Sequence, residues 1–580
     1  MAEQLTNRRI ADTFQAIADS MEILGEDRFR LLAYRRAAEA LADLPQPLAM
    51  YRERDELDAI PGVGKAIADK IEELLDTGQL QFYEKLRARL PESVLGMLRI
   101  PNLGPRTVGR LYTDLGIDSV EALRAAAESG KLDGIKGFGA KTIAGILQGI
   151  SSMQQEQRIL LFDALRAAES LITALRQALP EMQHISYAGS LRRGRDLIGD
   201  IDLLAASEDP SAVITALKGL PIVAQLVSSG TEKATVMLHN GLQIDMIALP
   251  PNMWGSALQH FTGSRQHNIR MREIALDRGL SFSEHGFKRQ DGTLITCATE
   301  EEVYAQIGLP WIAPELREQH GEFEAATAGK LPTLITLEQM RCDLHMHSTW
   351  SDGKSTLRAM AEAARARGYS HMAITDHSAF LGITNGLDDA RLHAQAAEVA
   401  ALNQELAPFM ILRGVEVDIT ADGSLALPDD VLADLDIVVA SPHVSLQQSL
   451  EASTERILRA IRNPHVDIIG HPTGRLLNSR AGSPIDIDAI GRAAAETGTL
   501  LEVNSGPERL DLEAGAVRHV LELGACITIN SDSHHSDNLG WIRLGVTTAR
   551  RGWAETDRVA NSWDLKTLQD WLARTHAQGA

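Results

Sequence analysis

The C-terminal part of the chain carries metal-binding side chains at the ends of short apolar runs. His345 and His347 end CDLHMH, His377 ends MAITDH, and His471 ends VDIIGH. The full set of such side chains is His345, His347, Asp352, His377, Glu416, His443, His471, Asp532 and His534. Barrels of alternating strands and helices place their chemistry at the C-terminal ends of the strands. The pattern therefore predicts a multinuclear metal site suited to phosphoester chemistry.

Seven strand-like runs alternate with helical stretches in this part of the chain. They are residues 341–347, 371–377, 411–418, 435–443, 466–471, 499–504 and 525–532. This alternation is typical of parallel strands joined by helices. It predicts a (β/α)7 barrel over residues 339–580.

The N-terminal part reads as helices that contain three copies of a small glycine-rich turn. The copies span residues 60–71, 100–111 and 135–146. Their glycines are Gly62, Gly64, Gly104, Gly137 and Gly139. Glycine lets the backbone approach a phosphate closely, and the following helix N-terminus offers free N–H groups. A plain corner between two helices is the alternative, but three copies favour binding of the DNA backbone through helix-hairpin-helix units.

Composition limits where any DNA contact can lie. The net charge of the 580 residues is −21, and neither half is basic, so DNA binding must depend on local features. No run of eighteen apolar residues predicts a membrane span, and the N-terminus has no apolar signal core. The three cysteines, Cys297, Cys342 and Cys526, are far apart and odd in number, which predicts a reducing, cytoplasmic location.

A second cluster of carboxylates is expected in the α+β segment that follows residue 153. Asp200 and Asp202 are two apart on an apolar strand, so both point to one face, and Asp245 can lie on a neighbouring strand. Three clustered carboxylates repel one another unless divalent cations bridge them. Upstream, Gly189 and Ser190 begin a turn rich in arginine, a combination that suits a triphosphate.

The string GSLRRGRDLIGDID resembles the nucleotidyltransferase motif of the family X DNA polymerases, and FTGS at residues 261–264 matches a later segment of that family. The resemblance implies template-directed DNA synthesis with Mg²⁺ or Mn²⁺ at Asp200, Asp202 and Asp245. It implies dNTPs and gapped or primer–template DNA as partners. The residues implied in nucleotide binding are Gly189, Ser190, Arg193, Gly199, His260, Phe261, Gly263, Asn268 and Arg272, of which Asn268 and Arg272 would contact the minor groove.

Two positions depart from that family. His260 stands where the family often has tyrosine beside the sugar, which predicts altered discrimination against ribonucleotides. Lys70 falls on the family's Schiff-base lysine, but Ala66 stands where polymerase beta has a second basic residue. Lys70 is therefore either a lyase nucleophile or a solvated helix lysine.

The nine ligands, in the order HxH, SDG, TDH, strand Glu, SPH, GHP and SDSH, resemble the PHP (polymerase and histidinol phosphatase) family over residues 339–575. The resemblance implies up to three Zn²⁺ or Mn²⁺ ions. One would bind His345, His347, Glu416 and Asp532, a second Glu416, His443 and His471, and a third Asp352, His377 and His534. Asp376, His535, Arg475 and Asn504 are either phosphate contacts or structural residues. Two-domain bacterial relatives are associated with 3′→5′ exonuclease and abasic-site endonuclease activity.

The resemblances divide the chain into six parts. They are a helical DNA-binding and lyase-like domain (1–90), a helix-hairpin-helix subdomain (91–152), an α+β nucleotidyltransferase palm (153–249), a nucleotide-binding subdomain (250–316), a linker (317–338) and a PHP phosphoesterase barrel (339–580). We expect a family X DNA polymerase that fills short gaps in DNA repair, in the bacterial cytoplasm and on the nucleoid, without a membrane.

Two alternatives remain. One is a phosphatase of the histidinol-phosphate type that carries a DNA-binding appendage, and the other is a non-enzymatic DNA-binding scaffold.

Overall fold

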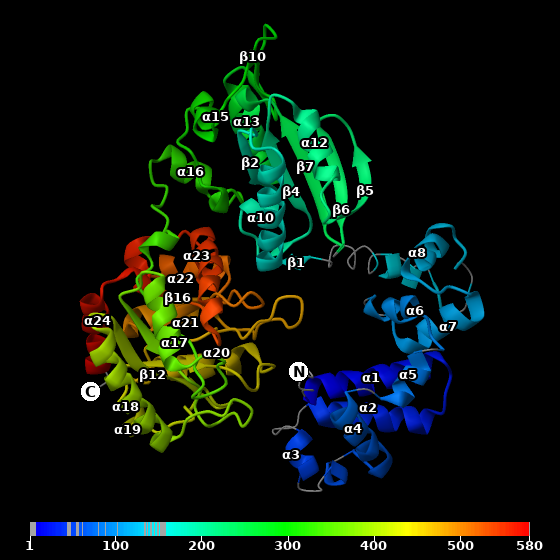
Figure 1. Cartoon of the computed structure of the whole chain (residues 1–580), viewed down its shortest axis with the longest axis vertical. Coiled ribbons are helices and arrows are strands. Elements are labelled where there is room, and N and C mark those ends of the chain that lie inside the picture. The colour runs from blue at the N-terminus through cyan, green and yellow to red at the C-terminus, as the bar shows by residue number, and fades with distance from the viewer. Residues whose placement is uncertain are drawn as a thin grey trace. The chain divides into compact units, whose positions relative to one another are not determined.

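The computed structural model describes residues 7–578, except for residues 43–47, 54–56, 61, 79, 88, 101–102, 133–134, 136, 140–141, 144, 148–149, 151–157 and 240. Two compact units divide the chain, Met1–Gln157 and Arg158–Ala580. In Figure 1 the first unit is coloured in blue shades, and the second runs from teal through green and yellow to red.

The first unit consists of helices. They are α1 (Asn7–Ile23), α2 (Arg28–Ala42), α3 (Leu48–Glu53), α4 (Lys65–Thr77), α5 (Gln81–Arg87), α6 (Glu92–Gly96), α7 (Pro105–Leu115) and α8 (Val120–Glu128), with short 3-10 turns at Leu57–Ala59 and Met97–Arg99. One core gathers around α1, α2 and α4, and a second around α7 and α8. The all-α prediction for this region therefore holds.

The predicted glycine turns lie where two of these helices begin. Gly64 and Gly104 are the residues before the first turns of α4 and α7. Gly62 and Gly137 have φ of 89° and 96°, in the left-handed region that favours glycine. A Cβ on Gly62 would lie 3.2 Å from the carbonyl oxygen of Arg36, so the turn also packs closely. The third copy lies only partly within the described residues.

The second unit begins with a five-stranded sheet in the order β2-β4-β7-β6-β5. The strands are β2 (His184–Tyr187), β4 (Ile201–Ala206), β5 (Val223–Ser229), β6 (Lys233–Leu238) and β7 (Gln243–Leu249). Only the β4–β7 pair in this sheet is parallel. A small ladder joins β1 (Ile159–Leu160) to β3 (Leu197–Ile198).

Helices cover both faces of this sheet because apolar residues of β4 alternate in direction. Leu203 and Ala205 pack in one core with α10 (Leu161–Ala178) and α12 (Pro210–Lys218). Leu204 packs on the other face with α13 (Trp254–Thr262). The short helix α11 (Gly189–Arg192) lies between β2 and β3 in the chain.

The 3-10 turn Pro251–Met253 leads into α13, and a mixed segment of helices and strands follows that helix. It contains α14 (Arg265–Asp277), the small sheet β10-β9-β8 and α15 (Glu300–Gln306). The three strands are β8 (Leu280–Ser283), β9 (Gly286–Arg289) and β10 (Leu294–Ile295). A 3-10 turn at Pro314–Leu316 ends the segment.

Residues 317–338, expected to be a linker, form an ordered and packed segment. They contain α16 (Glu322–Thr327), whose Phe323 and Ala326 are buried. Glu322 is fully buried and pairs with His267 at 2.8 Å. A helix of six residues is too short to show helical periodicity in sequence, which is why the pattern looked irregular.

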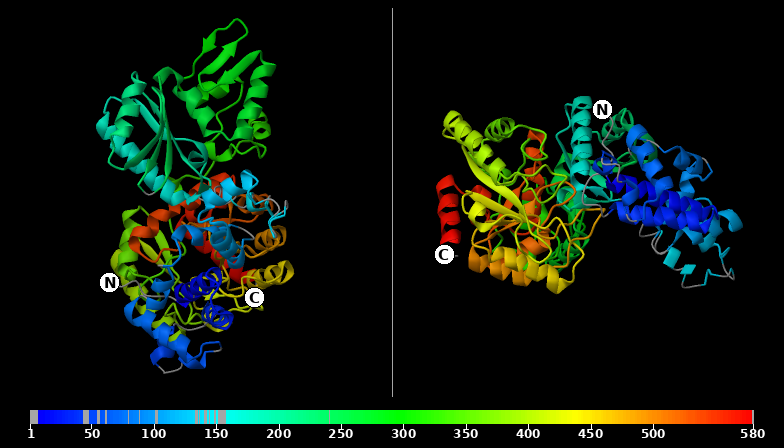
Figure 2. Two further views of the ribbon diagram at one scale, coloured as in Figure 1. Left: turned by 90° about the vertical axis from the view of Figure 1, so that its right-hand side faces the viewer. Right: turned by 90° about the horizontal axis from the view of Figure 1, so that it is seen from below.

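The C-terminal part is a six-stranded parallel sheet in the order β11 to β16. The strands are β11 (His371–Ile374), β12 (Met410–Asp418), β13 (Ile437–Ser441), β14 (Ile468–Ile469), β15 (Leu500–Asn504) and β16 (Ile527–Asn530). Its helices are α17 (Leu357–Ala366), α18 (Asp389–Leu406), α19 (Asp429–Leu432), α20 (Leu450–Ile461), α21 (Ile487–Thr497), α22 (Ala514–Glu522), α23 (Ile542–Arg551) and α24 (Leu565–Gln578). Figure 2 shows the long helices lying around the strands. Four 3-10 turns complete this part, at Leu337–Gln339, Ser536–Trp541, Thr556–Arg558 and Ala560–Ser562.

The first of the seven predicted strands, residues 341–347, is not a regular strand. It still lies between β16 and β11, because His347 N donates to Ser533 O and Ala373 N donates to Asp343 O. Side chains replace part of its backbone ladder. Leu344 N donates to an Asn530 oxygen, and the Asp343 carboxylate accepts from Ser531 N. The sheet is therefore a curled parallel half-barrel of six strands, with an irregular segment in the seventh position.

A buried ion pair stabilises the segment that precedes the barrel. Arg317 is fully buried and donates to Glu300 at 2.7 Å and to the carbonyl oxygen of Ile312 at 2.9 Å. Arg192 also pairs with Glu300, at 2.8 Å. Burial alone would raise the pKa of Glu300, but Arg317 and Arg192 hold it well below its usual value.

No helix in the described part of the chain has the length and hydropathy to cross a membrane.

Replacing Arg317 by methionine should lower the free energy of unfolding by about 3 kcal/mol, because Glu300 would lose one of its two buried cations. Urea denaturation measures this. Glu273→Gln removes an exposed pair with Arg270 and should cost no more than about 0.5 kcal/mol. Equal effects of the two changes would contradict the assigned role of Arg317.

Candidate active sites

Three carboxylates come together at one end of the five-stranded sheet. Asp202 of β4 and Asp245 of β7 are register partners on neighbouring parallel strands, and Asp200 lies two residues before Asp202. Burial, together with the charges of Asp200 and Asp245, raises the pKa of Asp202 to about 7, against the opposing effect of Arg193. Such mutual repulsion is relieved by divalent cations, so this donor set fits a metal site.

Neutral donors hold the third carboxylate. Thr235 Oγ1 donates to one oxygen of Asp245 at 2.6 Å, and Gln243 Nε2 donates to the other at 2.8 Å. Thr235 lies on the neighbouring strand β6, and Gln243 lies on β7 together with Asp245. They fix its orientation without neutralising it, which leaves its charge for a cation. The sequence offered no signal for Thr235, because it lies ten residues from Asp245 on a different strand.

The predicted glycine–serine turn lies directly against these carboxylates. Gly189 has φ of 56°, and a Cβ on it would lie 2.0 Å from Asp202 Oδ2. Ala188 N donates to the carbonyl oxygen of Asp202 at 2.9 Å, which ties the turn to β4. Ser190 follows at the start of α11, and Gly199 lies at the exposed end of the loop before Asp200. Glycine is therefore required at position 189 by both conformation and space.

Two arginines of the same turn are engaged by the following segment. Arg192 pairs with Glu300 through both guanidinium nitrogens, at 2.8 Å each. Arg193 donates to the carbonyl oxygen of Thr262 at 2.6 Å and to Glu318 at 3.0 Å. Arg192 is thus structural. Arg193 faces the charge of Asp202, and one of its N–H groups already donates to the Glu318 carboxylate.

The residues predicted to line the nucleotide site differ in exposure. His260 lies 3.9 Å from Glu284, and burial lowers its pKa. Phe261 lies under Lys233, with the ammonium 5.5 Å from the ring centroid. Gly263 has φ of 68° and approaches Arg193. Arg272 is exposed, and its Nε donates to the carbonyl oxygen of Asn268.

Asn268 does not face solvent as a minor-groove contact would. It is 7% exposed, its Nδ2 donates to His260 O at 2.6 Å, and its Oδ1 accepts from Gln259 at 3.0 Å. These bonds fix the start of α14 against the end of α13. The minor-groove role stays a prediction, and it requires Asn268 to leave these bonds.

Lys70, in the first unit, lies on α4 after the first glycine turn. Its ammonium donates to Ala66 O at 2.9 Å and lies 5.8 Å from the ring centroid of Phe82. Phe82 stacks on Tyr34, with ring centroids 5.7 Å apart. The amine therefore lies beside an aromatic surface, and both readings of Lys70 stay open.

Of the nine predicted ligands of the barrel, Glu416 is 1% exposed and lies among five of the histidines. Nitrogens of five histidines lie within 3.6 Å of its carboxylate oxygens. They belong to His345 (3.4 Å), His347 (3.6 Å), His377 (2.8 Å), His443 (3.3 Å) and His471 (3.0 Å). Asp532 lies 3.1 Å from His347, and Asp352 lies 3.3 Å from His534.

Several of these buried atoms are orphaned, which is a test of whether metal ions fit. Among the described residues, His345 Nε2, His377 Nδ1 and Glu416 Oε2 make no hydrogen bond, although each faces another ligand atom. Burial and the neighbouring His534 and His377 lower the pKa of His347 to about 3, so it remains neutral. The orphaned nitrogens and the carboxylate oxygens that face them form a donor set that fits divalent cations.

Three groups of ligand atoms each lie within 4.8 Å of one another. They are His345, His347 and Asp532; His377, Glu416 and His443; and His347, Asp352, His377 and His534. The groups are close to the three predicted ion sites. His377 and His347, however, each lie in two groups, whereas the sequence placed each with one ion. The number and identity of the ions stay predictions.

Buried carboxylates behind the histidines were not found from the sequence. Glu502 accepts from His345 Nδ1 at 2.8 Å and from His471 N at 2.7 Å. Asp418 lies 2.8 Å from His443 Nδ1. These contacts orient each ring so that its other nitrogen points at Glu416. Asp418 lies two residues after Glu416 on β12, so strand alternation was the one available signal.

The four less certain residues also have defined positions. Asp376 accepts from Ser348, Ser351 and Gln395 inside the fold, and Asn504 donates to Asp532 at 3.0 Å. His535 Nδ1 accepts from Asp537 N at a turn. Arg475 pairs with Asp196 at 2.8 Å. Among the described contacts, the side chain of Asn504 reaches a predicted ligand, and the backbone oxygen of Asp376 accepts from Glu416 N at 3.2 Å.

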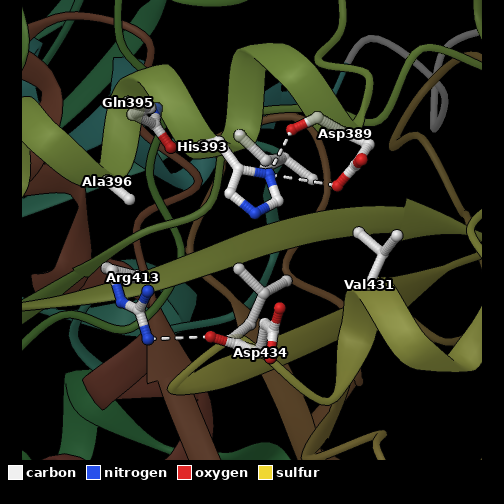
Figure 3. Close-up of a pocket in the computed structure, with 9 residues that line it drawn as sticks. Asp389, His393, Gln395, Ala396, Arg413, Val431 and Asp434 are labelled. Carbon is white, nitrogen blue, oxygen red and sulfur yellow. Dashed lines mark hydrogen bonds and ion pairs between the residues drawn. The ribbon is translucent and has the colours of Figure 1, made fainter.

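A hollow of about 310 Å³ on the outer side of the barrel lies between α18, β12 and α19 (Figure 3). Its two basic side chains each have a polar partner in the same hollow. His393 lies 3.1 Å from Asp389, and Arg413 donates to the carbonyl oxygen of Asp434 at 2.7 Å. None of its nine lining residues is a predicted ligand, so it is separate from the metal site.

The fold and these two clusters define a nucleotidyltransferase joined to a metal-dependent phosphoesterase barrel. Sequence families match in the same order. They are a helix-hairpin-helix domain (residues 5–80), a SAM-like helix-hairpin-helix tandem (94–151), the DNA polymerase beta thumb (257–318) and the PHP domain (343–505).

Individual relatives agree with this division. The chain is 41% identical over 567 residues to the DNA polymerase/3′-5′ exonuclease PolX of Bacillus subtilis, covering 97% of this chain and 98% of the relative. It is 26% identical to rat DNA polymerase lambda over 54% of this chain and 56% of the relative. A probable phosphatase of Thermoanaerobacter is 31% identical over 40% of this chain and 93% of its own length. The chain belongs to the PolX-type family X DNA polymerases that carry a PHP domain.

Gly189→Ala should lower the rate of primer extension by at least about a hundredfold, because the new Cβ would displace the Asp202 carboxylate. Gly219→Ala, at an ordinary φ with no contact closer than 3.5 Å, should leave extension unchanged. A steady-state extension assay compares them. Wild-type activity in Gly189→Ala would contradict the close packing of the turn.

Glu416→Gln should weaken metal binding at the barrel by at least about tenfold, because the shared carboxylate would lose its charge. Elemental analysis after dialysis against metal-free buffer measures the bound ions. Glu405→Gln, which changes an exposed carboxylate of α18, is the control. Full metal retention by Glu416→Gln would show that Glu416 is not a ligand.

Proposed function

We propose that the palm of this chain adds nucleotides to the primer end in short DNA gaps and that its barrel hydrolyses phosphodiester bonds. The observation that carries the first activity is the register pairing of Asp202 with Asp245, beside Asp200 and the Gly189 turn. This is the arrangement of carboxylates and backbone donors that a triphosphate and its cations require.

In the palm, Asp200, Asp202 and Asp245 are the proposed ligands of Mg²⁺ or Mn²⁺. Bound cations would supply activation of the primer hydroxyl and stabilisation of the pyrophosphate. The Ser190 hydroxyl, the backbone of Gly189 and Gly199, and Arg193 would hold the triphosphate. Thr235 and Gln243 keep Asp245 oriented toward the reacting end.

The nucleotide base and sugar would lie against the segment after α13. His260, Phe261 and Gly263 line this side, and Asn268 and Arg272 are the proposed contacts to the nascent pair. His260 places an imidazole where the sugar is expected, which supports altered discrimination against ribonucleotides. The substrates proposed are dNTPs with gapped or primer–template DNA.

In the barrel, the proposed cofactors are up to three Zn²⁺ or Mn²⁺ ions held by the nine ligands. Bound ions would supply a nucleophilic water and charge stabilisation for an attacked phosphate. Glu502 and Asp418 hold His345 and His443 in the required orientation. The similarity to the DNA polymerase/3′-5′ exonuclease PolX of Bacillus subtilis supports 3′→5′ exonuclease action here, and abasic-site cleavage is a second proposed reaction of the same site.

The six-part division derived from the sequence supports separate tasks. Residues 1–90 and 91–152 would bind DNA through backbone groups at Gly62, Gly64, Gly104, Gly137 and Gly139, and Lys70 would be the amine for any lyase step. Residues 153–249 and 250–316 would carry synthesis, and 339–580 cleavage. We propose a cytoplasmic protein that acts on the bacterial nucleoid in base excision repair.

A small-molecule phosphatase is the second candidate, because the probable phosphatase of Thermoanaerobacter matches the barrel over nearly its whole length. The two readings differ in substrate. A phosphatase would hydrolyse histidinol phosphate or a similar monoester faster than a DNA 3′ end. Both substrates should be assayed on one preparation.

On a gapped duplex with dNTPs and Mn²⁺, Asp200→Ala should lose gap filling by about three orders of magnitude and keep nuclease activity. The double change His345→Ala and His347→Ala should show the reverse. Gel analysis with and without dNTPs separates the two activities. Loss of both activities in either variant, with normal folding, would contradict two separate sites.

A further inference from the structure

The turn that faces the palm carboxylates is fixed from behind by the barrel. Asp196 lies three residues after Arg193 in the same string, GSLRRGRDLIGDID. Its Oδ2 accepts from Arg475 at 2.8 Å, and its Oδ1 accepts from Arg551 at 2.9 Å. All three side chains are at most 17% exposed. One carboxylate of the palm therefore binds two arginines of the barrel within a single compact unit.

The backbone beside Asp196 also packs against the barrel. Gly194 has φ of 66°, and a Cβ on it would lie 2.1 Å from the Thr547 methyl group on α23. Leu510 and Leu544 of the barrel are fully buried in the palm's own hydrophobic core. The turn that contains Gly189 and Arg193 is thus packed against α23 at Gly194, and the loop around residue 510 contributes to the palm core.

Arg475, which pairs with Asp196, also bonds to the loop that leads toward the predicted metal site of the barrel. Arg475 Nε donates to Arg509 O at 2.9 Å, and its Nη2 donates to Leu510 O. The next residue, Asp511, accepts from Thr473 N and Gly474 N in the loop that follows the ligand His471.

A backbone bridge completes the connection. Asp511 pairs with Asn504, whose side chain donates to the ligand Asp532 at 3.0 Å. Every step from Asp196 to Asp532 is a direct hydrogen bond or a peptide link between buried or half-buried groups.

From this continuous network we infer that Asp196 is a positioning residue shared by both active sites. Its carboxylate holds the turn that contains Gly189 and Arg193 against Arg551 and, through Arg475, holds the loop that carries His471 and the end of β15 at Asn504. This inference rests on the proposed functions of the two sites. It assigns to an ion pair between palm and barrel a role in dNTP binding as well as in cleavage.

A second ion pair between the same two parts distinguishes positioning from simple adhesion. Glu169 of α10 pairs with Arg543 of α23 at 3.0 Å, and these side chains are 46% and 35% exposed. Neither residue contacts the nucleotide turn, the Asp511 loop or a predicted ligand among the described contacts. Loss of this pair loosens the interface without moving either site.

The test compares Asp196→Asn with Glu169→Gln in the full-length chain. Asp196→Asn should raise the dNTP KM in gap filling by about fivefold or more, with kcat changed less than twofold, because binding geometry is altered rather than the carboxylates. Cleavage of a single-stranded 3′ end should fall by a similar factor. Glu169→Gln should change neither activity, and Asp196→Glu should restore part of both.

Unchanged dNTP KM and unchanged cleavage in Asp196→Asn, beside an active wild type, would overturn the inference and leave the proposed functions standing. Equal losses in Glu169→Gln would overturn it too, since adhesion alone would then explain both effects. If Asp196→Asn does not fold, Arg551→Lys takes its place with the same expectations for KM and kcat. A wild type inactive on DNA would instead refute the proposed functions.

Discussion

Close packing of buried ionisable groups in arrangements that suit divalent cations is the constraint on which both sites depend. In the barrel, Glu416 is buried among five imidazoles, and the facing nitrogens of two of them, His345 Nε2 and His377 Nδ1, make no hydrogen bond. In the palm, Asp202 lies against Asp200 and Asp245 with a raised pKa. Burying such groups without partners costs several kcal/mol per ion. The surrounding structure is therefore organised to hold them in place for a cation: neutral donors at Asp245, and carboxylates behind His345 and His443.

The scaffold delivers these groups because strand ends coincide in space. Parallel pairing of β4 with β7 aligns Asp202 with Asp245, and the parallel sheet β11 to β16 brings the strand-end ligands to one face. The irregular segment 341–347 adds His345 and His347 at the same end, since its side-chain hydrogen bonds take over from the missing ladder. The two active sites need no shared residue. Both, however, are supported by the packed contact of the turn at Asp196 with α23 and the loop at Leu510.

Local patterns were enough to predict the fold class and to select residues that the structure brings together. Two-residue spacing in GDID and in HMH, and ligands at the ends of apolar runs, are short-range signals that a sequence displays. Glu502, the burial of Asn268 and the Glu318 contact of Arg193 were not predicted, because each depends on residues distant in the chain. Helix α16 was missed because it is too short for a period to show. The predicted metal ligands can thus be recognised in the sequence, whereas the groups that orient them follow from packing.

The most direct test of two separate cation sites is anomalous X-ray scattering from crystals of the full-length chain grown with Mn²⁺. Anomalous peaks should lie within bonding distance of Glu416 and its imidazoles, and, with a bound nucleotide, between Asp200, Asp202 and Asp245. Absence of manganese at both places, at a concentration that supports activity, would contradict the account.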